Sequence, residues 1–277
     1  MSRTKPPYKL QLTNGFYLSL PQIARIMACS AGHPELERVP PEVYLTELGI
    51  TARRLENLSS LAVALGLLLP KVLTLTNLGR LAHRSDPYLD DLGTLWLLHY
   101  VISGDERYVV WNRLVNRVIP ESLRFSTAGA RPYFDDLTQY YSPRSMDDHL
   151  GKEIKAFWNA YIEQAFSHLD YLRAESEQIY VRGDPKPVPP RIFLAAMLLY
   201  RERYAPGAAT LGIPTLASAP NSPGRVFALG ERRVRDLLEE VEGPGGIYVE
   251  SRADLDQVRF PDDLTFLDAV RRYYEER

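Results

Sequence analysis

Six polar residues between positions 53 and 74 are of the types that proteins use to contact DNA. Arginine and asparagine read the edges of guanine and adenine in the major groove, and lysine and threonine commonly contact phosphates. The first four are spaced along a segment with helical periodicity, and the last two follow in a short β-branched run. These candidate DNA-binding residues are Arg53, Arg54, Asn57, Ser60, Lys71 and Thr74.

Two helices joined by a tight turn are expected to position the first four candidates. A helix is predicted over 42–48, with an apolar face at Val43, Leu45 and Leu48. It ends at Gly49, because glycine readily takes the positive φ with which chains leave helices. Thr51 is a suitable N-cap for the second helix, whose buried stripe leaves the candidates on or beside the solvent face. That stripe consists of Leu55, Leu58, Leu61, Ala62 and Leu65.

A short hairpin is predicted next. Gly66 closes the second helix, Pro70 lies in a turn, residues 72–75 favour a wing strand, and Thr76 caps a further helix from Asn77. This order is typical of a winged helix-turn-helix, which presents one helix face and one flexible tip to duplex DNA. Many winged helices only contact proteins, so a scaffold or adaptor that docks a protein partner is the alternative.

The distribution of charge along the sequence also indicates that the N-terminal part contacts a polyanion. The 277 residues contain 33 Lys+Arg and 35 Asp+Glu, a net charge of −2. Residues 1–84 contain ten basic and five acidic residues, a net of +5, so the remainder has −7. We therefore expect a polyanionic partner to meet the N-terminal part.

Acidic residues in the middle of the chain define a second alternative, a metal-dependent nuclease. The residues that could assemble its metal site are Asp135, Asp136, Asp147, Asp148 and His149. The simpler interpretation places Asp147 and Asp148 in the first turn of a long helix over 148–178, where carboxylates favour the helix dipole. No nuclease motif accompanies them. We therefore predict no catalytic residues, no bound metal and no cofactor.

A second acidic group lies between Asp86 and His99. Asp90 and Asp91 are adjacent, so their side chains diverge, whereas paired acid–base catalysis needs convergence. We expect Asp86 and Asp91 to cap turns or helix N-termini, and His99 to form a hydrogen bond within a buried helix.

The single cysteine, Cys29, is expected to exclude internal disulfides and a cysteine-based zinc site, and we expect it to be a packing residue. No run of about 18 apolar residues is present, so no membrane span is predicted. Residues 1–10 lack the apolar core of a secretory signal. A cytoplasmic location is expected, and the oligomeric state is left open.

The remaining elements predict a mainly α protein with small β hairpins. A first helix is expected over 16–31, another over 108–117 with Arg113 and Arg117 on its outer side, and an extended linker over 183–190. A helix over 231–242 and a hairpin around 251–254 are predicted to form a C-terminal helix-hairpin unit. This unit is either a second winged helix or a simple α+β cap, with Arg232, Arg233 and Arg235 facing outward. The expected domains are 1–85 (winged helix), 86–182 (helical) and 191–277 (helix plus hairpin).

Residues 86–100 carry a family resemblance. They read Asp-Pro-Tyr-Leu-Asp-Asp-Leu-Gly-Thr-Leu-Trp-Leu-Leu-His-Tyr. This is similar to the pattern Asp-Pro-Tyr-Leu-Glu-Asp-Pro-Gly-Thr-Leu-Trp-Leu-Leu-His-Trp of a bacterial family known as domain of unknown function 4007, and residues 75–81 resemble its Leu-Thr-x-Leu-Gly element. This chain departs from the pattern at Asp90, Leu92 and Tyr100. The Gly-His-Glu-Thr-Phe opening of the family is also absent, and residues 14–16 are its nearest counterpart.

The family has no established activity. Its genes often lie beside sulfur-transfer and DNA-modification genes of bacterial defence systems, such as those for phosphorothioation. The resemblance therefore implies an accessory protein of a DNA-modification or anti-phage system, with double-stranded DNA and other subunits of such a complex as partners. The winged-helix interpretation reaches the same DNA-binding role from the residues themselves.

Overall fold

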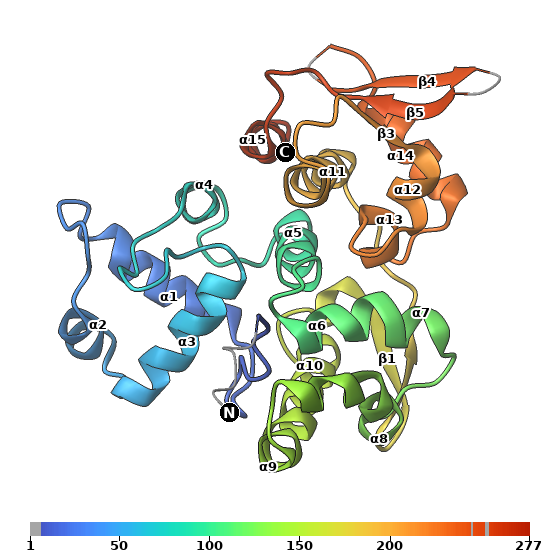
Figure 1. The fold of residues 1–277 in the computed structure, drawn as a ribbon. Coiled ribbons are helices and arrows are strands. Elements are labelled where there is room, and N and C mark those ends of the chain that lie inside the picture. Colours follow the sequence, from blue (N-terminus) through green and yellow to red (C-terminus); the bar gives the residue numbers. More distant parts are fainter. Residues whose placement is uncertain (1–6, 245, 253–254) are drawn as a thin grey trace. The chain divides into compact units, whose positions relative to one another are not determined.

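The computed structural model describes residues 7–244, 246–252 and 255–277 (Figure 1). The fold is mostly helical with two small antiparallel sheets, as predicted. Residues 1–186 form one compact unit and residues 187–277 form a second. The regions 1–85 and 86–182, which the sequence suggested as separate domains, both fall within the first unit.

Four helices form the N-terminal part of the first unit, and α1 packs against the other three. They are α1 (Leu20–Ala31), α2 (Pro41–Leu48), α3 (Ala52–Ala64) and α4 (Asn77–Ser85). The predicted caps are confirmed: Thr51 accepts a hydrogen bond from the backbone N of Arg54, and Thr76 accepts one from Gly79. The first helix is shorter than expected and begins after Ser19. The apolar face predicted for α2 is only half-buried, and Tyr44 is its buried residue.

The rest of the first unit is helical up to residue 169. Its elements are α5 (Leu92–Ser103), α6 (Val109–Arg113), the π-helix η1 (Leu114–Val118), α7 (Ile119–Glu121), α8 (Thr127–Ala130), the 3₁₀ helix η2 (Arg131–Gln139), α9 (Pro143–Ser145), the π-helix η3 (Met146–Leu150), α10 (Gly151–Ile162) and the 3₁₀ helix η4 (Ser167–Leu169). The core gathers around α5, in which every residue from Gly93 to Ser103 is buried. The aromatic rings of Trp96, His99, Tyr161 and Tyr171 pack mostly edge-to-face there.

The long helix predicted over 148–178 is wrong. The helix α10 ends at Ile162, Asp170 takes a left-handed conformation, and the chain then forms the hairpin β1 (Leu172–Ser176) and β2 (Ile179–Arg182). Phe125 pairs with Tyr180 and extends this small sheet. The extended linker predicted over 183–190 is confirmed up to Pro190, where the next helix begins.

Residues 9–13 are fastened to the first unit by hydrogen bonds. The backbone N of Lys9 donates to the carbonyl of Arg107 at 2.7 Å. The backbone N and the hydroxyl of Thr13 donate to the carboxylate of Glu153, at 3.0 and 2.7 Å. The indole Nε1 of Trp111 donates to the same carboxylate at 3.2 Å. Glu153 is 1% exposed, so this segment supplies partners for an acid deep in the core.

The second unit combines helices with a three-stranded sheet. Its elements are α11 (Pro190–Tyr204), β3 (Thr210–Gly212), α12 (Ile213–Ser218), α13 (Pro223–Val226), α14 (Glu231–Val241), β4 (Tyr248–Arg252), β5 (Leu255–Arg259) and α15 (Phe266–Glu275). The strand order is β3-β5-β4, all antiparallel. The helix-hairpin prediction is confirmed, whereas β3 was not foreseen. Residues 245, 253 and 254 of the predicted turns lie outside the described residues.

None of the helices in the described part of the chain is long and apolar enough to cross a membrane. The N-terminal residues 1–6, on which part of the signal-sequence prediction rests, are not among the described residues.

Candidate nucleic-acid interface

The helix pair α2–α3 has helix-turn-helix connectivity. Gly49 takes φ +63° at the end of α2, and α3 begins three residues later. A turn of this length, often containing glycine, joins the two helices of that motif. The hairpin after α3 is shorter than predicted. A single antiparallel bridge joins Leu68 to Leu75, in place of a wing strand over 72–75.

The backbone between these bridged residues explains why no strand forms. Lys71 and Leu73 have φ of +70° and +58°, which is incompatible with an extended strand. The turn is nevertheless held in place. The hydroxyl of Tyr44 donates to the carbonyl of Leu73 at 2.7 Å, and the backbone N of Val39 donates to Val72 at 3.1 Å. The residues after α3 therefore form a fixed loop that presents Lys71 to solvent.

Asn57 does not lie on the solvent face, so that part of the prediction is wrong. It is 1% exposed, and its amide Nδ2 donates to the carbonyl of Thr13 at 2.5 Å. Position 57 lies between Leu55 and Leu58 of the buried stripe, at an edge of α3. The segment around Thr13 covers that edge, so the Asn57 side chain is buried as well.

Arg54 is half-buried and is engaged within the protein. Its Nε and Nη2 donate to the side-chain oxygen of Gln22 at 2.8 and 2.5 Å. The guanidinium also lies 5.2 Å from the centre of the Phe16 ring. Burial lowers the pKa of Arg54 from its ordinary value. Arg54 therefore joins α3 to α1 and to the preceding segment, and it is not freely offered to a ligand.

The other four candidates remain at or near the surface. Arg53 is exposed, and its guanidinium lies 5.6 Å from the centre of the Phe16 ring. Ser60 is half-buried and Lys71 is exposed, and both line a groove beside α3. Thr74 is half-buried and lines a different pocket, of about 440 Å³, beside Arg80 and His83. The six candidates are therefore divided among separate surfaces.

The groove beside α3 has a volume of about 510 Å³. Its lining is mostly apolar, with Lys9, Glu56 and Lys71 as its charged members. Burial lowers the pKa of Lys9, against the opposing influence of Glu153 and Glu56. One side of α3 thus faces a concave surface with positive charge at its rim.

The described basic residues of the N-terminal part are a source of positive charge without salt bridges. Among described residues 7–85, no lysine or arginine takes part in an ion pair. Seven of them are exposed: Lys9, Arg25, Arg38, Arg53, Lys71, Arg80 and Arg84. The middle of the chain differs, since several arginines there are paired with carboxylates. The excess positive charge counted from the sequence is therefore available to solvent in this part.

Three of the acidic residues of the nuclease alternative, Asp136, Asp147 and Asp148, are paired with arginines. Arg113 donates to the carboxylate of Asp136 through Nη1 at 2.5 Å and Nη2 at 2.8 Å, which lowers the pKa of Asp136. Arg113 is buried, so its predicted place on the outer side of the helix is wrong. The remaining pairs join Arg131 to Asp147 and Arg144 to Asp148. Among the described residues, no group of metal-ligating side chains gathers at this site.

The residues of the family motif have the structural roles expected of them. The Asp86 carboxylate accepts hydrogen bonds from the backbone N of Asp90 at 3.3 Å and of Asp91 at 3.1 Å. Asp91 caps α5 by accepting from the backbone N of Thr94 at 3.0 Å. His99 Nδ1 contacts the hydroxyl of Tyr161 in the core. Burial raises the pKa of Asp86, against the effect of these hydrogen bonds.

In the C-terminal unit two of the three arginines predicted to face outward on α14 are paired with carboxylates, and Arg232 is exposed. Arg233 pairs with Glu240 at 3.1 Å, and Arg235 pairs with Glu231 at 2.7 Å and with Asp256 at 2.6 Å. Charge in this unit therefore favours a folded helix-on-sheet packing over contact with a polyanion.

One cluster was not anticipated from the sequence. Cys29, His33 and Glu47 are the group of metal-ligating residues that the described part of the chain brings together. The Cys-x-x-x-His spacing across the end of the first helix was the available signal, since residues four apart share a helix face.

Comparison with known proteins identifies the family. The model of the family described as "Protein of unknown function (DUF4007)" matches residues 64–274. No curated protein matches the chain. Two solved structures are similar in fold, one described as the magnesium ion-bound SspB crystal structure and the other as the SspB crystal structure. Each has a TM-score of 0.77 and 19% sequence identity, over 95% of this chain and 87% of that chain. Because the family model covers most of the chain, including the Asp86–Tyr100 motif, this protein belongs to the DUF4007 family.

Proposed function

We propose that this protein is a non-catalytic accessory protein that binds duplex DNA through its N-terminal helices, within a bacterial DNA-modification or anti-phage system. The observation that carries the proposal is the set of exposed, unpaired cations among residues 7–85. Contacts of lysine and arginine with phosphates supply most of the affinity of non-specific DNA binding. The helix-turn-helix connectivity of α2 and α3 supports the same role.

The proposed contact surface is narrower than the sequence alone suggested. Arg53 and Lys71 are its leading cations, and Ser60 adds a half-buried hydroxyl from the same helix as Arg53. Thr74 lines a different pocket and is not included. Arg54 and Asn57 act as internal supports of α3. We infer a winged-helix-like mode in which the fixed turn at Lys71 takes the place of a longer wing. Location in the cytoplasm follows from this proposal, since that is where the DNA lies.

A charge-reversal experiment tests the proposal. Fluorescence anisotropy with a duplex of mixed sequence measures affinity at several KCl concentrations for the wild type and for an Arg53→Glu, Lys71→Glu double variant. Each phosphate contact makes the slope of log affinity against log salt more negative by about 0.9. A double variant that loses two contacts should therefore show a slope shallower by about 1.8 than that of the wild type. The control is Lys152→Glu, Lys155→Glu, because these exposed lysines of α10 give the same change in net charge.

Two results would refute the proposal. One is a wild-type protein that does not bind duplex DNA at low salt. The other is an equal loss of affinity in both double variants, since that would reflect net charge and not a defined surface.

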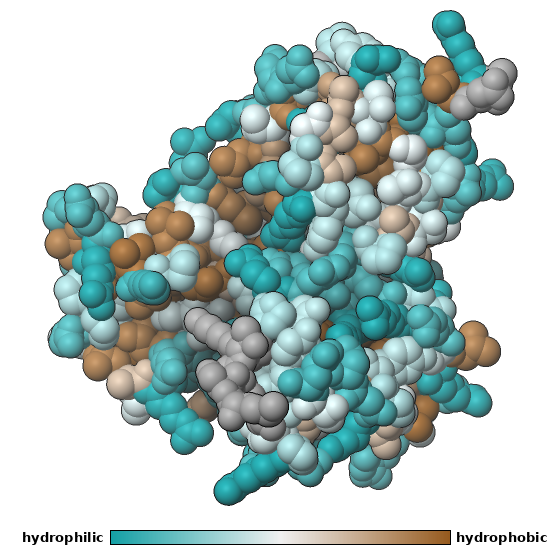
Figure 2. Space-filling view, in the orientation of Figure 1, coloured by the Kyte–Doolittle hydropathy of each residue, from teal (hydrophilic) through white to brown (hydrophobic). Residues whose placement is uncertain are grey.

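A protein adaptor is the second candidate, and the apolar groove beside α3 favours it. Hydrophobic surface is also visible among polar residues over the N-terminal helices in Figure 2. Val63 lines the groove and is half-buried. If the groove holds a protein partner, Val63→Glu will abolish co-purification with co-expressed proteins that are encoded beside this one, while Arg53→Glu will not.

A metal-dependent nuclease is the remaining alternative, motivated by the description of one SspB structure as magnesium ion-bound. In this chain the central carboxylates of Asp136, Asp147 and Asp148 are bound to arginines, which disfavours a metal site there. Incubation of supercoiled plasmid with the protein and Mg²⁺ distinguishes the two roles. Nicking that is lost in an Asp147→Asn, Asp148→Asn variant would replace our proposal with this alternative.

A further inference from the structure

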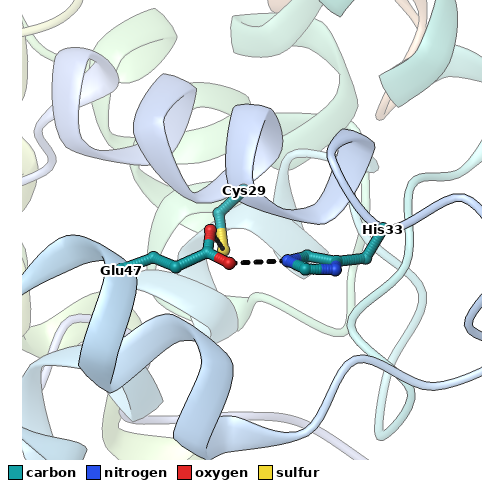
Figure 3. A group of neighbouring side chains, drawn as sticks. All are labelled: Cys29, His33 and Glu47. Atoms are coloured by element: carbon teal, nitrogen blue, oxygen red, sulfur yellow. Dashed lines mark hydrogen bonds and ion pairs between the residues drawn. The ribbon is translucent and has the colours of Figure 1, made fainter.

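Three potential metal ligands meet where α1 and α2 pack together (Figure 3). Cys29 lies in the last turn of α1, His33 follows just after the helix ends, and Glu47 lies in the last turn of α2. The Cys29 thiol donates to Glu47 Oε2 at 3.3 Å, and His33 Nε2 lies 2.7 Å from Glu47 Oε1. The three ligand atoms all lie within 4.8 Å of one another.

These separations suit a divalent cation. Zinc is bound by thiolate sulfur at about 2.3 Å, by imidazole nitrogen at about 2.0–2.1 Å and by carboxylate oxygen at about 2.0–2.2 Å, in tetrahedral geometry. Such bond lengths place neighbouring ligand atoms about 3.3–3.6 Å apart. Small side-chain rotations would therefore bring the sulfur, the nitrogen and one oxygen to one ion. That ion would replace the hydrogen bonds that now join Cys29 and His33 to Glu47.

The surroundings of His33 match those of a metal-binding histidine. Its second ring nitrogen, Nδ1, lies 3.5 Å from the carboxylate of Glu35. Metal-ligating histidines almost always donate their other N–H to a carboxylate, carbonyl or water, which fixes the ring and the tautomer. With Nε2 on a metal, the Nδ1–H of a neutral ring would point at Glu35. This second partner is an observation independent of the three-residue cluster.

Access is also adequate. Cys29 is 6% exposed, whereas the side chains of His33 and Glu47 are 27% and 45% exposed. An ion could enter from solvent and keep a water molecule as its fourth ligand, while its sulfur ligand stays protected. The thiol proton now lies in the hydrogen bond from Cys29 to Glu47, and metal binding would release it to solvent.

We propose that Cys29, His33 and Glu47 form a binding site for a thiophilic divalent cation, with Zn²⁺ preferred. The ligands come from both helices, so the ion would fix the end of α2 against the end of α1. This inference is independent of DNA binding. It differs from our sequence-based expectation, which excluded a cysteine-based zinc site, treated Cys29 as a packing residue and predicted no bound metal.

Cobalt substitution tests the proposal directly. Metal-free, tag-free full-length protein is titrated with Co²⁺, and absorption is recorded. A thiolate-to-cobalt charge-transfer band must come from Cys29, because it is the only cysteine in the chain. We expect one equivalent of Co²⁺ to produce the band and Zn²⁺ to abolish it by displacement.

Single substitutions distinguish a site formed by all three side chains from binding of Co²⁺ by the Cys29 thiol alone. His33→Gln and Glu47→Gln should each weaken Co²⁺ binding at least about tenfold, since each removes a ligand. Glu35→Gln should have a smaller effect. The matched control is His168→Gln, an exposed histidine elsewhere in the same unit, which should leave binding unchanged.

The proposal is overturned if no charge-transfer band develops, or if the His33→Gln and Glu47→Gln proteins bind Co²⁺ as tightly as the wild type. Both variants alter partly exposed side chains, and their circular dichroism spectra and thermal unfolding without metal establish that they are folded. Cys29→Ser removes the band in either case and serves only to assign it.

Discussion

Replacing Asn57 by alanine separates a structural role from a DNA-reading role. The side chain is 1% exposed and donates to the carbonyl of Thr13, which is itself fully buried. Removing the amide loses a hydrogen bond worth about 1 kcal/mol, and it leaves a buried carbonyl unsatisfied at a cost of about 1–3 kcal/mol. We therefore expect Asn57→Ala to lower the free energy of unfolding by about 2–4 kcal/mol.

Urea unfolding followed by tryptophan fluorescence measures this loss. All three tryptophans, Trp96, Trp111 and Trp158, lie in the unit that contains Asn57, so the signal reports on its unfolding. In a unit of this size, each 1 kcal/mol shifts Tm by about 2–4 °C, so a decrease of about 4–16 °C is expected in a thermal scan. The exposed neighbour provides the control, because Arg53→Ala should change stability by less than about 0.5 kcal/mol.

The reasoning also predicts the effect on DNA. Folded Asn57→Ala protein, assayed below its unfolding transition, should bind duplex DNA as the wild type does, whereas Arg53→Glu should bind more weakly. An Asn57→Ala protein with wild-type stability and reduced DNA affinity would show that this side chain reaches solvent, and would refute the assignment.

Three further predictions concern the supports of the first unit. A methyl group at Gly79 would lie 2.1 Å from the carbonyl oxygen of Leu67, so Gly79→Ala should lower the free energy of unfolding by about 2–3 kcal/mol in urea titrations. A methyl group at Gly151 would have no atom within 4 Å, so the control Gly151→Ala should raise it by about 0.5–1 kcal/mol. Burial raises the pKa of Glu153 above its unfolded value of 4.5, so the unfolding free energy of the wild type should fall as pH rises from 4.5 through the folded pKa. The Glu153→Gln protein should lack this decrease when unfolding is measured at a series of pH values. The same dependence of unfolding free energy on pH in both proteins would contradict the shift. Asp91→Ala should cost about 1 kcal/mol by removing the cap of α5, and Asp91→Asn should restore most of it in thermal scans.

Local signals in the sequence were sufficient for the starts of three helices. Thr51, Thr76 and Asp91 each cap a helix through a hydrogen bond to a residue three positions on, so the information is contained within one turn. The positive φ of Gly49 is equally local. These features were predicted correctly because no distant residue decides them.

The hairpin β1–β2 could not be predicted from local propensity. Residues 171–178 are rich in alanine, glutamate and glutamine, which favour helix. Pairing with Phe125, far away in the sequence, overrides that preference. The turn residues Asp170 and Gln178 take positive φ without being glycine, so the usual sequence signal of a turn was missing.

The candidate interface was only partly predictable for the same reason. Helical periodicity separates a buried stripe from the rest of α3, but it cannot tell which remaining positions face solvent and which face another segment. The chain around Thr13 and Phe16 covers Asn57 and Arg54, and nothing in residues 52–64 indicates this. In the same way, Glu47 reaches Cys29 only because α2 packs on α1.

The fastening of Thr13 to Glu153 has a practical consequence for shortened versions of this protein. A chain that starts at Asn14 would remove two of the three groups that donate to a carboxylate in the core, leaving Trp111 as the donor that remains among those described. The same cut would strip Asn57 of its acceptor. Expression of the α1–α10 region for crystallisation should therefore retain residues 9–13, even though they belong to no helix or strand.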